Sequence, residues 1–275
     1  MSRTSVETAH VPGYIGETAP WYGCNRNPEC IGYCWYHNRI VPRFAANPNI
    51  TCAKCKTGEP HVHLELMKPT MAGRMEPRCY SGHMGEIADL PPLAIELIQK
   101  VTRHPNSRNH IFQPFTHRPM EFYAKYPDWS ENVWACGTFT QGRIKMPRRL
   151  NAGKIVAYCE PVMGELLLDV PGVETVETDN RYSDHCLRCG YELEIDITHE
   201  CPPGFGRFPD WLVIGLLNPD NYARYGITLE QVAGWIKSLM AQADDLGIPV
   251  YCKKKDDSRW EKMGIEPIQR WPICG

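Results

Sequence analysis

The sequence lacks any long hydrophobic run. No apolar stretch approaches the about 18–20 residues needed to cross a bilayer, and the first twenty residues, MSRTSVETAHVPGYIGETAP, contain no apolar core of the kind that a secretory signal requires. An excess of one charge is also missing, because 30 Lys and Arg face 32 Asp and Glu, giving a net charge of −2. We therefore expect a cytoplasmic protein with no membrane partner and no general electrostatic attraction to nucleic acid.

Cysteine, by contrast, is abundant. Disulfides are unusual in a reducing compartment, so thirteen cysteines call for another explanation. Grouped cysteines are typical of metal sites, whereas isolated ones in apolar runs are usually small buried hydrophobes. The groups here are Cys24, Cys30 and Cys34, then Cys52 and Cys55, and then Cys186, Cys189 and Cys201, with Cys79 standing between groups.

After this cysteine-rich first third, apolar segments alternate with amphipathic ones. "GKIVAYC" (153–159) and "DWLVIGLL" (210–217) are near-continuous apolar runs, typical of strands that are covered on both faces. Thr228 and Gln231 form a capping box at the start of a strongly periodic helix. Strands separated by helices predict a parallel sheet, either a barrel or a doubly wound sheet.

Polar residues at the strand ends favour the barrel. They follow successive predicted strands, and the carboxyl ends of barrel strands form the rim where ligands bind. We therefore predict an α/β fold of the (β/α) barrel type. The strand-end residues are Thr116, His117, Arg118, Thr138, Thr140, Glu160, Asn218, Lys253 and Lys254.

The first cysteine group allows two interpretations. Cys24, Cys30 and Cys34 follow a C-x5-C-x3-C spacing, and His37 could complete a zinc site of three cysteines and one histidine. The same three thiolates could instead hold a [4Fe-4S] cluster and leave one iron open to another ligand. The spacing alone does not separate these two possibilities.

The ordered motifs resemble a phage-associated, radical-SAM-like family of largely uncharacterised proteins. They begin with the three-cysteine loop and a proline-started helix. The motifs "FTHRPMEFY", "NVWACGTFTQGR", "VAYCEPVMGEL", "DWLVIG" and "GIPVYCKKK" then follow in order. The likeness covers roughly residues 20–40 and 85–255. Two departures are the wider cysteine spacing and "GLLNPD" in place of the family's glycine-glycine-glutamate.

The resemblance implies a radical-SAM-type partial barrel with a [4Fe-4S] cluster on Cys24, Cys30 and Cys34. S-adenosylmethionine would bind the open iron, and an electron from a reductant such as ferredoxin or flavodoxin would produce a 5′-deoxyadenosyl radical. Glu160 would bind the amino group of the methionine part, and Arg118 or Lys253 its carboxylate. The expected cofactor-binding residues are Thr116, Arg118, Thr138, Glu160, Asn218 and Lys253.

The two C-x2-C knuckles predict structural zinc in preference to an auxiliary cluster. Cys52, Cys55, Cys186 and Cys189 could meet in one four-cysteine site. Alternatively, each knuckle could use nearby ligands. These sets are Cys52, Cys55 and Cys79 with one of His61, His63 and His83, and Cys186, Cys189, His199 and Cys201.

These interpretations divide the chain into a cluster loop (1–45), a knuckle insertion (46–84) and a partial barrel (85–275) with a second zinc-ribbon-like insertion at about 170–208.

The expected function is that of a radical-SAM enzyme. Its substrate would be a small molecule or nucleotide, with nucleic acid as a further option. The alternative is a non-catalytic zinc-ribbon protein that binds or adapts other macromolecules. An anaerobically purified cluster protein is brown, whereas a zinc protein is colourless.

Overall fold

The computed structural model describes residues 17–25, 34, 36–72, 77–82, 85–147, 149–168, 208–217, 219–253 and 257–272. Some predicted site residues lie outside this part of the chain. They are Cys30, His83, Asn218, Lys254 and the whole second knuckle with Cys186, Cys189, His199 and Cys201.

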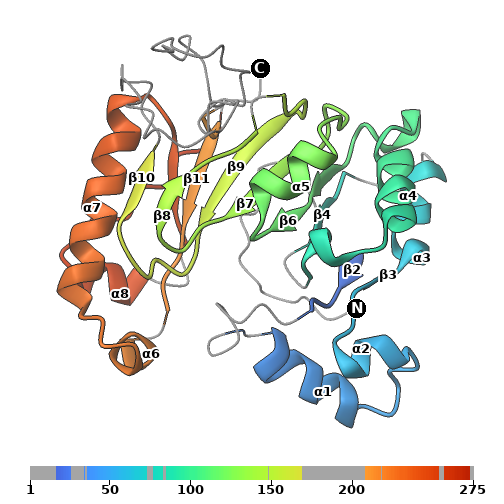
Figure 1. The fold of residues 1–275 in the computed structure, drawn as a ribbon, viewed down its shortest axis with the longest axis horizontal. Helices are drawn as coiled ribbons and strands as arrows, with labels where there is room; N and C mark the ends of the chain where they lie inside the picture. The colour runs from blue at the N-terminus through green and yellow to red at the C-terminus, as the bar shows by residue number, and fades with distance from the viewer. Residues whose placement is uncertain are drawn as a thin grey trace, which may run out of the picture.

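Two parallel sheets make up the body of the protein (Figure 1). The first has the order β1-β4-β5, and the second has the order β12-β11-β9-β7-β6. Their strands are β1 (Glu17–Thr18), β4 (Cys79–Ser81), β5 (Ile111–Gln113), β6 (Phe115–Thr116), β7 (Trp134–Thr138), β9 (Lys154–Cys159), β11 (Trp211–Ile214) and β12 (Val250–Cys252).

Pro114 marks the junction between the two sheets. It is the only residue between β5 and β6, and it has no N–H with which to continue the ladder. A parallel bridge between Phe112 and Val133 joins the two sheets at this point. The strands therefore neighbour one another in chain order from β1 to β12, whereas a doubly wound sheet reverses its order at a switch point.

The predicted α/β class and the parallel sheet are confirmed. The barrel is not detected, because no pairing between β1 and β12 closes the sheet in the part of the chain that the structure covers. The near-continuous apolar sequence of the central strands has the expected cause. Every residue of β11 is buried, as are all residues of β9 after Lys154.

Alternate residues of the strands serve two different cores. On one sheet face, Ala135, Ile155 and Leu212 belong to a large cluster that also contains residues of the helices. These helices are α4 (Pro92–Thr102), α5 (Pro119–Lys125) and α7 (Leu229–Asp245). Trp134 and Trp211 point to the opposite face and belong to a second cluster. This period of two is what a strand buried on both faces requires.

The second face is lined by aromatic rings and covered in part by the C-terminal segment. Trp271 packs 5.2 Å from Trp211 and 4.8 Å from Tyr251, measured between ring centroids. The indole N–H of Trp211 donates to the carbonyl of Arg270 at 3.0 Å, so the buried ring is also satisfied as a donor.

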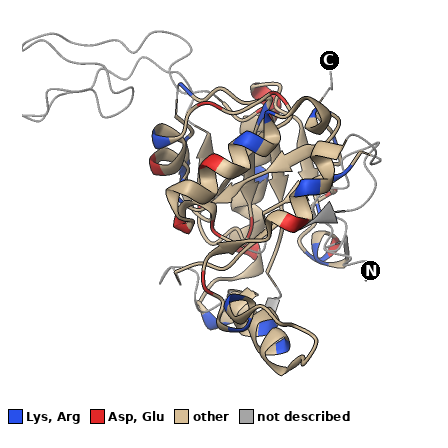
Figure 2. Ribbon diagram, turned by 90° about the vertical axis from the view of Figure 1, so that its right-hand side faces the viewer, with Lys and Arg blue, Asp and Glu red and all other residues tan. Residues whose placement is uncertain are grey.

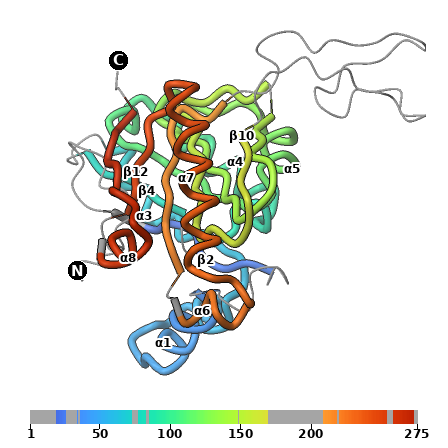
Figure 3. The backbone as a smooth tube through the Cα atoms, turned by 90° about the vertical axis from the view of Figure 1, so that its left-hand side faces the viewer, coloured from blue at the N-terminus to red at the C-terminus, as the bar shows by residue number. Residues whose placement is uncertain are grey.

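Helix α7 begins as the sequence predicts. The hydroxyl of Thr228 accepts from the N–H of Gln231, and the side chain of Gln231 accepts in return from Thr228. Later in the helix, Gln242 bonds the backbone of β10 (Leu166–Leu168), which pairs with β8 (Gly142–Ile144). Figure 3 shows α7 running along the side of the molecule beside β10.

The first part of the chain forms a small unit of short elements. They are β2 (Trp21–Tyr22), the π-helix Tyr36–Ile40, α1 (Val41–Ala46), α2 (Ala53–Thr57), β3 (His61–Val62) and α3 (Leu64–Met67). Helices α1 and α2 lie at the same end of the molecule as α6 (Pro219–Arg224), which follows the carboxyl end of β11 (Figures 1 and 3). Strands β1 and β4, from the ranges assigned to the cluster loop and the knuckle insertion, pair with each other in the sheet β1-β4-β5, where β4 also pairs with β5.

Charged residues of both signs are distributed over the ribbon (Figure 2), as the near-zero net charge suggests. Among the described residues, no helix combines the length and apolar character needed to span a membrane.

We expect Leu212→Ala to lower the free energy of unfolding by about 2–5 kcal/mol, because it would open a cavity in the fully buried centre of the sheet. Urea denaturation would measure the loss. Leu93→Ala, the same change at a side chain that is 66% exposed, should cost far less. Equal losses in the two variants would contradict this packing.

Candidate metal centre

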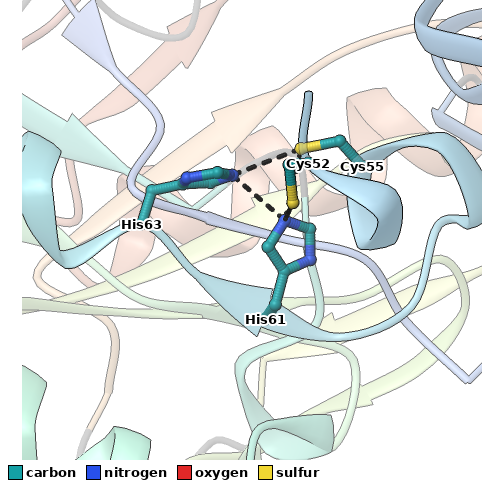
Figure 4. A group of neighbouring side chains, drawn as sticks. All are labelled: Cys52, Cys55, His61 and His63. Carbon is teal, nitrogen blue, oxygen red and sulfur yellow. Dashed lines mark hydrogen bonds between the residues drawn. The ribbon is translucent and has the colours of Figure 1, made fainter. Parts of the chain in front are cut away.

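The first knuckle brings four potential metal ligands together (Figure 4). Cys52 is the N-cap of α2 and Cys55 lies in its first turn, so the C-x2-C spacing directs both sulfurs to one side. Gly58 ends the helix with φ +79°, a left-handed conformation that glycine adopts without strain. The chain then returns through β3, so that His61 in this strand and His63 directly after it, two residues apart, face the sulfurs.

The ligand atoms have the spacing of a mononuclear site. The Sγ of Cys55 lies 3.3 Å from Nε2 of His61 and 3.2 Å from Nε2 of His63, and the two Nε2 atoms are 3.1 Å apart. The Sγ of Cys52 lies 3.6 Å from Nε2 of His61. Tetrahedral zinc, with bonds of about 2.3 Å to sulfur and 2.0 Å to nitrogen, would separate such ligands by roughly 3.3–3.8 Å. The four residues therefore fit a zinc ion.

Both histidines are held by a second contact. Nδ1 of His61 donates to the carbonyl of Glu59 at 2.7 Å, and Nδ1 of His63 lies 2.6 Å from a carboxylate oxygen of Glu65. These acceptors keep the ring proton on Nδ1, so that each Nε2 presents its lone pair to the centre. Metal-binding histidines in proteins usually have such partners.

Burial shifts the pKa values of two of the four potential ligands. It lowers the pKa of His61, which favours the neutral ring that a metal binds. Burial, followed by the neighbouring Cys52, raises the pKa of Cys55 to about 12, so the free thiol stays protonated at neutral pH. A bound zinc ion would reverse this preference, because it coordinates the thiolate.

The described residues offer a local ligand set for this knuckle. Cys52 and Cys55 are completed by two local histidines, so neither Cys79 nor the second knuckle is needed to fill four positions. Cys79 lies in β4, buried on the aromatic face of the sheet. The predicted partners Cys186 and Cys189 lie outside the described residues.

Part of the first cysteine group lies close to this centre. Cys24 follows β2, and its Sγ is 3.0 Å from Nε2 of His37 in the π-helix. The carbonyl of Cys34 accepts from the N–H of Asn38, which places Cys34 at the start of the same helix. Burial, followed by Cys55 and Cys24, raises the pKa of Tyr36. Cys30 lies outside the described residues.

The Cys24 segment is tied to the carboxyl end of β6. The N–H of Asn25 donates to one carboxylate oxygen of Asp89 at 2.7 Å, and Arg118, just after β6, pairs with the other. Glu86 makes a second tie, since its N–H donates to the carbonyl of Gly23 at 2.9 Å and its carboxylate accepts from the N–H of His117 at 2.7 Å. The predicted residue Arg118 is thus positioned beside the cysteine loop.

The structure also brings Glu160 and Lys253 together as an ion pair. They follow β9 and β12, and Lys253 is only 3% exposed. Gly215, after the strand between them, leaves room for the pair, because a Cβ there would lie 2.6 Å from the carboxyl carbon of Glu160. The Nζ of Lys253 also lies 5.8 Å from the ring centroid of Tyr158.

The two predicted threonines differ in their surroundings. Thr116 is buried, and its hydroxyl accepts from the N–H of Arg118 at 2.9 Å, so it shapes the turn after β6. Thr138 is half-buried at the end of β7, opposite Tyr158. Asn218 lies outside the described residues.

Three polar residues of this region were not predicted as site residues. Asp89 and Glu86 act through contacts about 30 positions away in the chain, which no local pattern reveals. Gln113 is fully buried in β5 opposite Ser81, and its side-chain amide has no hydrogen-bond partner among the described residues. The signal for Gln113 was a glutamine inside the apolar run "IFQPF".

Comparison with known proteins adds no further assignment. No protein-family model, curated protein or solved structure matches the chain. The functional argument therefore depends on the ligand groups and the strand-end residues themselves.

We expect the chelator-treated protein to bind one zinc ion at the Cys52 centre and to release protons as it does so, because protonated thiols must become thiolates. Isothermal titration calorimetry in buffers of different ionisation enthalpy would measure the release at pH 7. Cys55→Ala should remove one zinc ion and the proton release that accompanies its binding. Zinc binding without release of protons would contradict thiolate ligation.

Glu160→Ala should lower the free energy of unfolding by about 3 kcal/mol, since it leaves the buried ammonium of Lys253 without its carboxylate. Asp244→Ala is the matched control. It breaks an ion pair with Arg270 in which both side chains are more than half exposed, and should cost under about 1 kcal/mol. Equal costs would show that the Glu160 pair is solvated.

Proposed function

We propose that the chain is a radical S-adenosylmethionine enzyme built on a partial (β/α) barrel. The observation that carries the proposal is the position of Cys24, which hydrogen bonds link through Asn25 and Asp89 to Arg118 at the carboxyl end of β6. In an α/β sheet of parallel strands, that end is where ligands bind. In addition, neighbouring strands of the sheets follow one another in the order of the chain, which favours a barrel over a doubly wound sheet.

Cys24, Cys30 and Cys34 would hold the [4Fe-4S] cluster. With a cluster and S-adenosylmethionine bound, the site would supply one-electron cleavage of the sulfonium carbon–sulfur bond, with the electron coming from a ferredoxin or flavodoxin. A small molecule or nucleotide would be the substrate.

The residues of the chain would bind, orient and shield. The carboxylate of Glu160 already accepts from Lys253 and has further lone pairs for the amino group of a methionine moiety. Arg118, half-exposed and held by Asp89, has guanidinium donors for a carboxylate. The aromatic cluster around Trp134 and Trp211 would exclude water from the face of the sheet that it lines.

The Cys52 centre would have a structural role. A zinc ion there would clamp α2 to β3 with a closed set of four ligands, which leaves no open position for a substrate or water.

A second candidate is favoured by the contact between Cys24 and His37. Their ligand atoms are 3.0 Å apart, close enough to share one small ion, whereas ligands on different irons of a cluster are held farther apart. Cys24, Cys30, Cys34 and His37 would then form a second zinc site, and the protein would be a non-catalytic binding module or adaptor.

Anaerobic purification separates the two candidates. For the enzyme, we expect iron alongside zinc, a broad brown absorption, and 5′-deoxyadenosine after incubation with reductant and S-adenosylmethionine, detected by mass spectrometry. Cys34→Ala should abolish the iron, the colour and the product. Cys159→Ala, at a buried cysteine of the sheet, should retain them. A colourless protein that contains zinc and no iron would overturn the enzyme proposal.

A further inference from the structure

The turn at Gly58 and Glu59 belongs to the Cys52 centre and also touches Cys24. The N–H of Cys24 donates to the carbonyl of Gly58 at 3.2 Å. The approach is close at the preceding residue as well, because a Cβ on Gly23 would lie 2.2 Å from the carbonyl oxygen of Glu59. The backbone that carries Cys24 therefore lies directly against this turn.

The turn is held on one side by a residue next to a ligand of the Cys52 centre and on the other side by a ligand itself. On one side, the N–H of Gly58 closes helix α2 by donating to Lys54 at 2.8 Å, next to Cys55. On the other side, the carbonyl of Glu59 accepts from Nδ1 of His61 at 2.7 Å. A metal ion that joins Cys55 to His61 would therefore fix the shape of the turn between them.

The turn also contacts the partner of Cys24. A Cβ at Gly58 would come within 2.9 Å of Cε1 of His37 and 2.9 Å of a methyl group of Val41. The Nε2 of the same histidine lies 3.0 Å from the sulfur of Cys24. One two-residue turn thus supports both members of the Cys24–His37 pair.

We propose that metal binding at Cys52, Cys55, His61 and His63 shapes the Gly58–Glu59 turn into the support that holds Cys24 and His37 in place. Metal binding at these four residues would then promote metal or cluster binding by Cys24, as a coupling between two sites. The inference rests on a metal ion in the Cys52 centre, which is one part of the proposed function. It holds whether Cys24 binds an iron–sulfur cluster or zinc.

Alkylation of Cys24 tests the coupling. The protein as purified would be treated with iodoacetamide under anaerobic conditions, and the modification of each cysteine followed by peptide mass spectrometry. In the unaltered protein, we expect Cys24 to be protected. Cys52→Ala removes a ligand that is not in the turn, and should raise the alkylation rate of Cys24 about tenfold or more through local opening. Lys54→Ala, an exposed non-ligand change on the same helix, should leave the rate unchanged.

Gly58→Ala tests the contact itself. A methyl group at this position should displace His37 and strain the left-handed turn, while all four ligands of the Cys52 centre remain. We expect this variant to keep its zinc at that centre and to lose the protection of Cys24. The proposal is wrong if Cys24 is exposed to alkylation in the unaltered protein, or if its protection persists in Cys52→Ala or in Gly58→Ala.

Metal analysis of the same samples keeps this test separate from the proposed function. If the unaltered protein lacks iron but Cys24 protection depends on Cys52, the enzyme proposal fails and the coupling stands. If iron is present and Cys24 protection is the same in every variant, the coupling alone fails.

Discussion

Convergence of four potential metal ligands between Cys52 and His63 is the constraint on which the account of the N-terminal unit depends. This unit has very short elements. Trp21 and Met67 anchor its two ends in the large apolar cluster, whereas the part around the π-helix and α1 has a minor cluster of its own, centred on Tyr36 and Ile40. Tyr22 links that cluster to the ligands, since its ring stacks on His61 at 5.9 Å and meets His63 edge-on at 5.4 Å. Metal coordination in such a unit contributes directly to folding.

The sheet β12-β11-β9-β7-β6 differs from this unit, because its stability comes from apolar packing on both faces. Its apolar residues leave polar groups only at the ends of the strands, and there the structure gathers two arrangements of charge. Glu160 and Lys253, which follow the carboxyl ends of β9 and β12, form one ion pair. Arg118, which follows β6, forms another with Asp89. The second arrangement also holds the backbone beside Cys24, so the packed sheet and the N-terminal unit meet at one edge.

Much of this could be predicted from local patterns. The capping box of α7, the buried central strands and the metal-binding character of the first knuckle all follow from residue type and spacing over a few positions. The sequence could not decide which histidines complete the knuckle, since that depends on how β3 returns against α2. Nor could it locate the partners of Asp89 and Glu86, because these contacts join residues about 30 positions apart. Whether a sheet stays open or closes depends on the tilt and stagger of all its strands together, which no single local pattern encodes.

X-ray absorption at the zinc edge tests the central claim most directly, because it counts the sulfur and nitrogen neighbours of the bound ion. For a chain in which Cys34→Ala, His199→Ala and Cys201→Ala have removed the other candidate local centres, the account predicts two sulfurs at about 2.3 Å and two nitrogens at about 2.0 Å. Four sulfurs would instead mean that the knuckle recruits distant cysteines, and would contradict a closed centre formed by Cys52, Cys55, His61 and His63.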